Sequence, residues 1–233
     1  MKKIIIAFTM LVFGTVSAHA IDRSIFSVTA GIAANQGVFG ASAKETNLTD
    51  TNTTGHVKKE SGVFTDSFGS QFLELGIGEW ISLGYEHTPD SVTTPTNTSR
   101  HGHAAEANVS VDFNDLNTTY LRVNLPFAAG MYAKVGTVST DLDIKETMGS
   151  GSTYSNVSTD GNVMGLGYHK FINDSRIGLR IEGSYLELDN VSTSNGVSAT
   201  GATVANGGRN TIDASNLEGL TAKIALTITL GKD

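Results

Sequence analysis

Residues 71–86 read QFLELGIGEWISLGYE, and this stretch decides the fold. Apolar side chains occupy every second position on both sides of Gly78-Glu79: Leu73, Leu75 and Ile77 before it, and Ile81, Leu83 and Tyr85 after it. The positions between them carry mostly small or polar residues, such as Gly76 and Ser82. Because successive side chains of a strand point to opposite faces, this alternation predicts an amphipathic β-hairpin with a tight turn.

The same alternation runs from Ile25 to the end of the chain and predicts eight strands. Short connections at 78–79, 126–130 and 172–176 take turns with long polar ones at 45–67, 88–106, 147–159 and 190–213. Tight turns at one end and long loops at the other are typical of a transmembrane β-barrel. The sequence therefore predicts an all-β, eight-stranded antiparallel up-and-down barrel with short periplasmic turns and long external loops.

The first twenty residues have the features of a signal peptide for Sec export. Lys2-Lys3 precede an apolar run from Ile4 to Val16, and Ala18-His19-Ala20 supplies the small residues of a cleavage site. The apolar run is too short to span a bilayer as a helix. We expect cleavage after Ala20, a barrel domain over residues 21–233, and a final location in a bacterial outer membrane.

The charge balance narrows the range of partners. Residues 21–233 contain 14 basic and 23 acidic side chains, a net charge of −9, which disfavours nucleic acid as a ligand. The absence of cysteine fits an envelope protein that needs no disulfide bonds.

A soluble β-sandwich would alternate in the same way, so two further features weigh in favour of a barrel. The polar face is built of Gly, Ser, Thr and a few charges, as a narrow lumen requires. In addition, aromatic residues lie beside the short turns, where we expect them at one membrane–water interface: Trp80, Phe127, Tyr132 and Phe171.

Seven charged residues share the inward face of the predicted strands. They are Glu74, Glu86, Arg122, Lys134, Arg180, Glu182 and Lys223. Opposite charges in similar numbers inside a small barrel predict an ion-pair network that closes the lumen, because an unpaired buried charge is costly. The alternative is a water-filled pore in which these charges set ion selectivity.

The chain resembles the small eight-stranded outer-membrane barrels of the opacity-protein and outer-membrane-protein-A transmembrane-domain type. The resemblance covers nearly all of residues 21–233 and is carried by strand segments such as 130–136 (GMYAKVG), 162–168 (NVMGLGY) and 180–185 (RIEGSY). It implies a structural or surface-interaction role in adhesion or envelope integrity. The alternative that it leaves open is a narrow porin-like diffusion channel.

The resemblance also implies the partners: outer-membrane lipid, lipopolysaccharide and the barrel-assembly machinery, with a monomeric barrel whose loops can reach an external partner. One departure concerns assembly. Such barrels usually end in an aromatic residue, whereas this sequence ends Leu230-Gly-Lys-Asp233, so Leu230 or Ile228 would have to replace the aromatic signal.

Few residues suggest chemistry outside the lumen. His101 and His103 form a poor metal site without further ligands, and the acidic residues Asp141, Asp143 and Glu146 fit a solvated strand end better than a cation site. His87 is the one candidate catalytic residue at the external rim, and no adjacent nucleophile accompanies it. We therefore expect no catalysis, metal or cofactor.

One irregularity is predicted in the fourth strand. Val109, Val111 and Phe113 alternate ahead of Asn114-Asp115, which suggests an extension of this strand above the membrane with a bulge at Asn114-Asp115.

Overall fold

The computed structural model describes residues 25–49, 52–99, 107–147, 153–173, 175–198 and 208–231. The predicted signal peptide, His101 and His103 lie outside these residues. The strands are β1 (Phe26–Thr49), β2 (Asn52–Ile77), β3 (Ile81–Thr88), β4 (Val92–Thr93), β5 (Asn97–Ser99), β6 (Ala107–Asn124), β7 (Met131–Thr147), β8 (Val157–Phe171), β9 (Ile177–Leu188), β10 (Val191–Ser194) and β11 (Arg209–Leu230).

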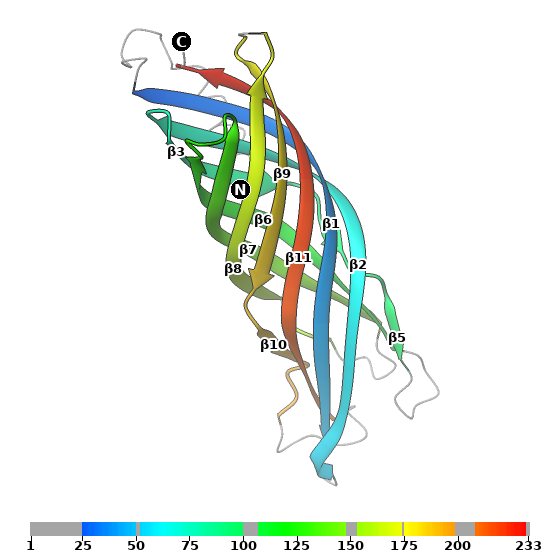
Figure 1. Cartoon of the computed structure of the whole chain (residues 1–233). Helices are drawn as coiled ribbons and strands as arrows, with labels where there is room; N and C mark the ends of the chain where they lie inside the picture. Colours follow the sequence, from blue (N-terminus) through cyan, green and yellow to red (C-terminus); the bar gives the residue numbers. More distant parts are fainter. Residues whose placement is uncertain are drawn as a thin grey trace.

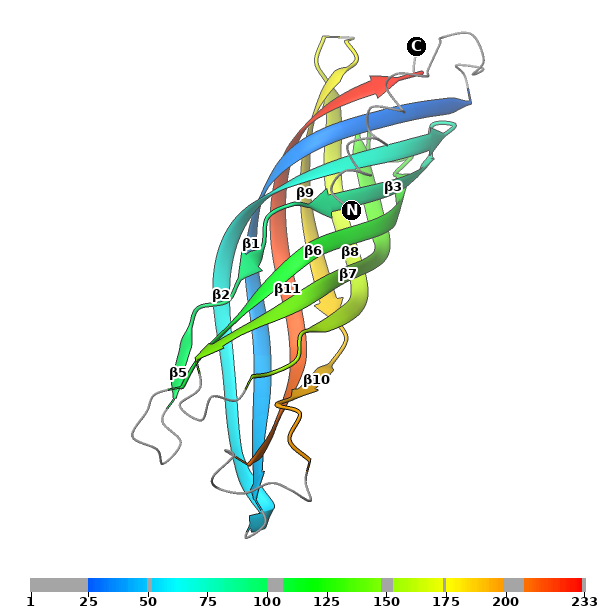
Figure 2. The same cartoon turned by 180° about the vertical axis from the view of Figure 1, so that it is seen from behind.

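Eight of these strands form a closed antiparallel ring, which confirms the predicted fold. The order is β1, β2, β3, β6, β7, β8, β9 and β11, and β1 closes the ring by pairing with β11 from Val28–Leu230 upward. Figures 1 and 2 show these strands tilted around a common axis. The short β4 and β5 run along β6, and β10 runs along β11. Within the described part of the chain, no helix is long and apolar enough to cross a membrane.

The three short connections lie where the sequence predicts them, together at one end of the barrel (Figure 1). They join β2 to β3, β6 to β7 and β8 to β9. Gly78 and Gly130 adopt φ angles of 61° and 82° in the first two turns. Glycine adopts this left-handed backbone conformation without the steric cost that a side chain brings.

The prediction of a long loop over 45–67 is wrong. β1 and β2 continue as a hairpin through this region, with pairs from Gly37–Asp66 to Thr49–Asn52. Its threonines, valines and Phe64 favour extended backbone, and both faces can be polar where a hairpin stands in water. At about 3.3 Å per residue, the 24 residues of β1 extend roughly 80 Å. An apolar band of about 25 Å needs far less than this length.

Two other predicted loops contain strand as well. Residues 88–106 include β4 and β5, and residues 190–213 include β10 and the first residues of β11, which begins at Arg209. The predicted bulge is confirmed, because the β6–β7 register shifts between Asn114 and Asn117 and Asp115 has a φ of 49°.

Burial is inverted relative to a water-soluble protein. Large apolar side chains are exposed on the outer face, for instance Ile32, Leu83, Leu166, Leu220 and Ile224. The inner face buries charged and hydroxyl side chains instead. The soluble-sandwich alternative is therefore wrong, because a sandwich packs its apolar faces together and leaves the polar faces to water.

Candidate functional site in the lumen and the external cavity

The structure brings together all seven predicted lumen charges, in two adjoining clusters. The first is centred on Glu74, whose Oε1 and Oε2 accept hydrogen bonds from Nη1 and Nη2 of Arg180 at 2.6 and 2.8 Å. Tyr120 donates its hydroxyl to Glu74 Oε1 at 2.8 Å, and Arg122 Nη1 lies 3.3 Å from Oε2. A two-pronged arginine–carboxylate pair fixes both side chains in orientation.

The second cluster joins two carboxylates to two lysines. Lys223 Nζ lies 2.6 Å from Glu86 Oε2 and 3.3 Å from Glu182 Oε1. Lys134 pairs with Glu182 and lies 3.6 Å from Glu86 Oε2. Ser70 donates to Glu86 at 2.7 Å, and Tyr132 donates to Glu182 at 2.7 Å. Every carboxylate in the two clusters thus has both cationic and hydroxyl partners.

Aromatic rings lie against cationic side chains in these clusters. Arg180 Cζ lies 4.6 Å from the ring centroid of Phe72, and Arg122 Cζ lies 5.1 Å from that of Tyr132. Lys134 Nζ lies 4.8 Å from the ring centroid of Tyr120. The faces of these rings attract cations, and the attraction strengthens where water is excluded.

The four aromatics predicted at the membrane interface do not share one environment. Trp80 and Phe127 are exposed beside the short turns, the latter 83% exposed. Tyr132 is fully buried in the lumen, so its predicted position is wrong. Its place in the strand gives the reason, because Tyr132 has the same parity as the inward Lys134. Phe171 is half-buried, and its ring centroid lies 4.7 Å from that of His169.

Inward aromatic residues face glycines across the strands, a feature that the sequence analysis missed. Tyr120 pairs with Gly84 and Tyr132 pairs with Gly167, and in each case a Cβ on the glycine would overlap the tyrosine ring. The glycines therefore make the room in which the rings lie. The signal was present in the sequence as alternating glycines on the polar face, but the partner of each glycine follows only from the register.

Above the charged clusters, toward the long loops, the lumen becomes apolar. On β9 the inward side chains pass from Arg180 and Glu182 to Leu186 and Leu188. These leucines belong to a buried apolar layer with Val138, Val163 and Leu217. A small cavity of about 30 Å³ lies beside Leu186, Leu188 and Leu217, with room for about one water molecule.

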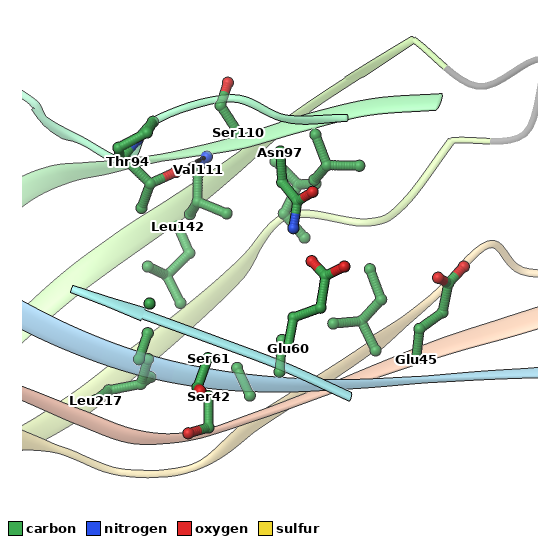
Figure 3. A pocket seen from close by; sticks show the side chains of 18 of the residues that line it. Ser42, Glu45, Glu60, Ser61, Thr94, Asn97, Ser110, Val111, Leu142 and Leu217 are labelled. Carbon is green, nitrogen blue, oxygen red and sulfur yellow. Dashed lines mark hydrogen bonds between the residues drawn. The ribbon is translucent and has the colours of Figure 1, made fainter. Parts of the chain in front are cut away.

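Above the apolar layer lies a cavity of about 850 Å³, at the end of the barrel opposite the short turns. Its apolar walls come from β2, β6, β7 and β11 and include Phe64, Val111, Phe113, Leu142, Ile144 and Leu217. Figure 3 shows Val111 and Leu142 on one side of this space and the carboxylates of Glu45 and Glu60 directed into it. The sequence did not predict this cavity, because the segment with Phe64 was expected to be a loop and the pairing of the extended strands was not known.

Tyr154 and three charged residues define the polar side of the cavity. Lys58 pairs with Glu60, and the Tyr154 hydroxyl lies 3.4 Å from Glu45 Oε1. Burial raises the pKa of the Tyr154 hydroxyl, and the nearby Glu45 carboxylate adds to this shift. Tyr154 therefore stays a neutral hydrogen-bond donor at physiological pH.

The wall of the barrel has a seam beside this cavity. β2 pairs with β3 only from Gln71–His87 to Ile77–Ile81, and above Gln71 its described residues pair with β1 alone. Across the seam, the Thr93 backbone N–H donates to Asp66 Oδ2 at 3.1 Å. Residues 60–64 and 94–98 line the cavity from the two sides of the seam.

An ion pair fastens the outer face of β6 and β7 near the cavity. Lys145 donates to Asp112, which also accepts a hydrogen bond from Thr93 Oγ1 at 2.9 Å. The hydrogen bond from Lys145 lowers the pKa of the Asp112 carboxyl. The same interaction raises the pKa of Lys145. The pair thus links three strands, β4, β6 and β7.

The other candidates for chemistry have protein partners. His87 is buried, and its Nδ1 lies 2.7 Å from the amide oxygen of Asn117. Asp143 accepts from Asn114 and Asn156, Asp141 from Ser158, and Glu146 from the Tyr154 backbone. Among the described residues, no three His, Cys, Asp or Glu side chains are grouped so that they could hold a metal ion.

No protein-family model matches the sequence, and no curated protein matches it significantly. Solved structures do resemble the fold. The outer membrane protein OprG from Pseudomonas aeruginosa gives a TM-score of 0.55 at 10% identity, over 86% of this chain and 96% of that one. Outer membrane protein AlkL, solved in DMPC lipid bilayers, gives 0.52 at 10% identity, over 86% and 90%.

The outer membrane protease OmpT from Escherichia coli gives a TM-score of 0.49 at 10% identity, over 88% of this chain and 97% of that one. That value is too low to carry an inference about function. The two higher scores, together with the closed ring of eight strands, show that the chain has the β-barrel fold of small outer-membrane proteins.

Proposed function

We propose that this chain is a bacterial outer-membrane β-barrel with a closed lumen, and that it serves as a structural or surface-interaction protein through its external end. The observation that carries this proposal is the inverted burial. An apolar outer face surrounds a buried set of paired charges, as expected for a barrel in lipid. The apolar face would contact membrane lipid, and the long hairpins would stand outside the cell beside lipopolysaccharide.

The closed lumen is supported by packing at two successive levels. The seven charged side chains are buried and paired with one another, and a layer of buried apolar side chains lies above them. A conducting pore instead keeps its charged lining in water, where ions can pass. The contacts therefore favour a closed barrel over the narrow diffusion channel, which stays as the second candidate function.

Export and assembly are part of the same proposal. We propose that residues 1–20 direct Sec export, that the chain inserts as a monomer with the help of the barrel-assembly machinery, and that catalysis and cofactors play no part. Leu230 pairs with Val28 where β11 and β1 close the ring, so an apolar residue occupies the last position of β11.

The orientation can be tested by labelling single cysteines, because the natural chain has none. Thr98→Cys places a thiol at the external end, and Glu79→Cys places one in a short turn. We expect a membrane-impermeant maleimide to label Thr98→Cys on intact cells and Glu79→Cys only after the outer membrane is opened. The reverse pattern, or recovery of the protein in the soluble fraction, would contradict the proposal.

A further inference from the structure

We propose that the external cavity binds one small apolar molecule that carries a hydrogen-bond-donating group, such as an alcohol or an amine. This inference rests on the proposed function, because the cavity meets the surroundings of the cell only if this end of the barrel lies outside. The cavity volume of about 850 Å³ falls in the range of sites for small molecules.

The walls give the apolar part of the ligand its place. Phe113, Leu142 and Ile144 from adjacent strands line the cavity together with Phe64 and Leu217. An apolar surface of this size that faces water is unfavourable, and an apolar ligand would remove it from water. Each strand that carries these side chains is paired with at least one neighbour at this level, β2 with β1 and β6 with β7, so the site is formed before a ligand arrives.

The floor of the cavity sets the depth of the site. Leu217 lines the cavity and also belongs to the apolar layer with Leu186 and Leu188. Beneath that layer lie the paired charges of the lumen, with Lys223 and Glu182 in contact. A ligand would therefore stop at the apolar layer and be held at the external end.

The polar side of the cavity selects the head group. Two carboxylates, Glu45 and Glu60, are directed into the space (Figure 3). Tyr154 donates a hydrogen bond to Glu45, and Lys58, the one lysine of the lining, is paired with Glu60. Carboxylates accept hydrogen bonds and repel anions. A donor such as a hydroxyl or an ammonium is favoured there, and a carboxylate on the ligand is disfavoured.

The seam between β2 and β4–β5 provides an entry. Its two edges, residues 60–64 and 94–98, both line the cavity, and a side chain, Asp66, bridges them to the backbone at Thr93. A side-chain bridge breaks more easily than a ladder of backbone hydrogen bonds. The ligand can therefore reach the cavity from the side as well as from the open end.

The test uses two probes with the same ring system, 1-naphthylmethanol and 1-naphthoate. They are titrated into the full-length mature chain in lipid nanodiscs, with methyl NMR signals of leucine and valine as the readout. We expect saturable shifts at Val111, Leu142 and Leu217 with the alcohol, and an affinity at least tenfold weaker for naphthoate. Leu226 on the outer face reports partitioning into lipid, which grows without saturation.

Two matched variants on β1 separate the cavity from the rest of the surface. Ala43 lines the cavity. The next residue, Lys44, is exposed, and its Nζ lies 3.9 Å from Asp213 Oδ2 in a weak surface ion pair. We expect Ala43→Trp to occupy part of the cavity and to weaken the saturable binding, and Lys44→Trp to leave it unchanged.

The inference fails if cavity methyl groups show no saturable shift with the alcohol in the natural chain. It also fails if Ala43→Trp, shown to be folded by its spectrum, binds as well as the natural chain. Equal affinity for both probes would overturn the choice of head group. Because nanodiscs expose both ends of the barrel, none of these results depends on the orientation tested by cysteine labelling.

Discussion

At the scale of single residues, glycine and tyrosine act as pairs in the lumen. Tyr120 reaches Glu74 with its hydroxyl only because its ring lies over Gly84, and Tyr132 reaches Glu182 in the same way over Gly167. Each pair combines a large and a small side chain at facing positions of neighbouring strands. This arrangement lets a narrow barrel hold an aromatic ring and an ion pair at one level.

Replacing Gly84 with Ala is expected to destabilise the barrel. The new Cβ would overlap the ring of Tyr120, which is itself fixed by its hydrogen bond to Glu74. Overpacking of this kind costs about 1–3 kcal/mol. Thermal unfolding in detergent measures the effect, and Gly62→Ala serves as the control because a Cβ there meets nothing within 4 Å. Equal stability of the two variants would argue against the Gly84–Tyr120 contact.

Replacing Glu74 with Gln is expected to have a larger effect. It leaves Arg180 and Arg122 buried without their shared carboxylate, and removing one partner of a buried pair costs about 3–5 kcal/mol. Lys44→Ala, which breaks an exposed pair, is expected to cost less than about 1 kcal/mol. Urea unfolding in lipid or detergent compares the two. A Glu74→Gln barrel as stable as the Lys44→Ala barrel would show that the lumen charges are solvated.

At the scale of elements, the parts that stand above the apolar belt follow different rules from the parts within it. β1 and β2 form a hairpin over residues whose composition suggests a loop, since alternation no longer marks a strand when water lies on both faces. Parity within a strand does predict side-chain direction. Parity with Lys134 predicts that the Tyr132 side chain points into the lumen, where the structure buries it. The nearness of Tyr132 to a short turn instead suggests the membrane interface.

The link between β4, β6 and β7 is expected to depend on pH. The folded state lowers the pKa of Asp112 below its ordinary value of 3.8, so the charged form stabilises the folded arrangement. This contribution is complete above that ordinary value and is lost as the pH falls through the lowered folded value. We expect NMR titration of the Asp112 carboxyl carbon to show this lowered pKa, and Lys145→Ala to raise it.

A contrary result is simple to recognise. If the Asp112 carboxyl titrates alike in the natural chain and in Lys145→Ala, the ion pair does not hold these strands together in solution. Lys44→Ala provides the control, since Lys44 lies on β1 and pairs with Asp213 instead.

At the scale of the whole molecule, eight strands, their order and the three short turns could be predicted from the sequence. Period-two alternation can be read within each strand, because a strand of the barrel has one apolar outer face and one polar inner face. The grouping of the inward charges into two clusters could not be predicted, because it depends on the stagger of strands around the ring. Glu74 and Arg180 are 106 residues apart and meet across the lumen only after the ring closes.

The cavity could not be predicted for a related reason. Its walls come from the ends of β2, β6, β7 and β11 that lie farthest from the short turns. In the sequence, these strand ends lie far apart, within or beside the predicted long loops. Only the register of the extended hairpins places Phe64, Val111 and Leu142 around one space. In the proposed account, a closed lumen therefore lies beneath an open external cavity.

The most direct test of the closed lumen is single-channel recording of the folded protein in a planar lipid bilayer. The buried ion pairs and the apolar layer predict a silent membrane at moderate voltage, for the natural chain and for Lys44→Ala alike. Steady conductance steps whose size or ion selectivity changes in Arg180→Gln or Glu74→Gln would contradict the account, because they would show that water and ions pass the charged clusters.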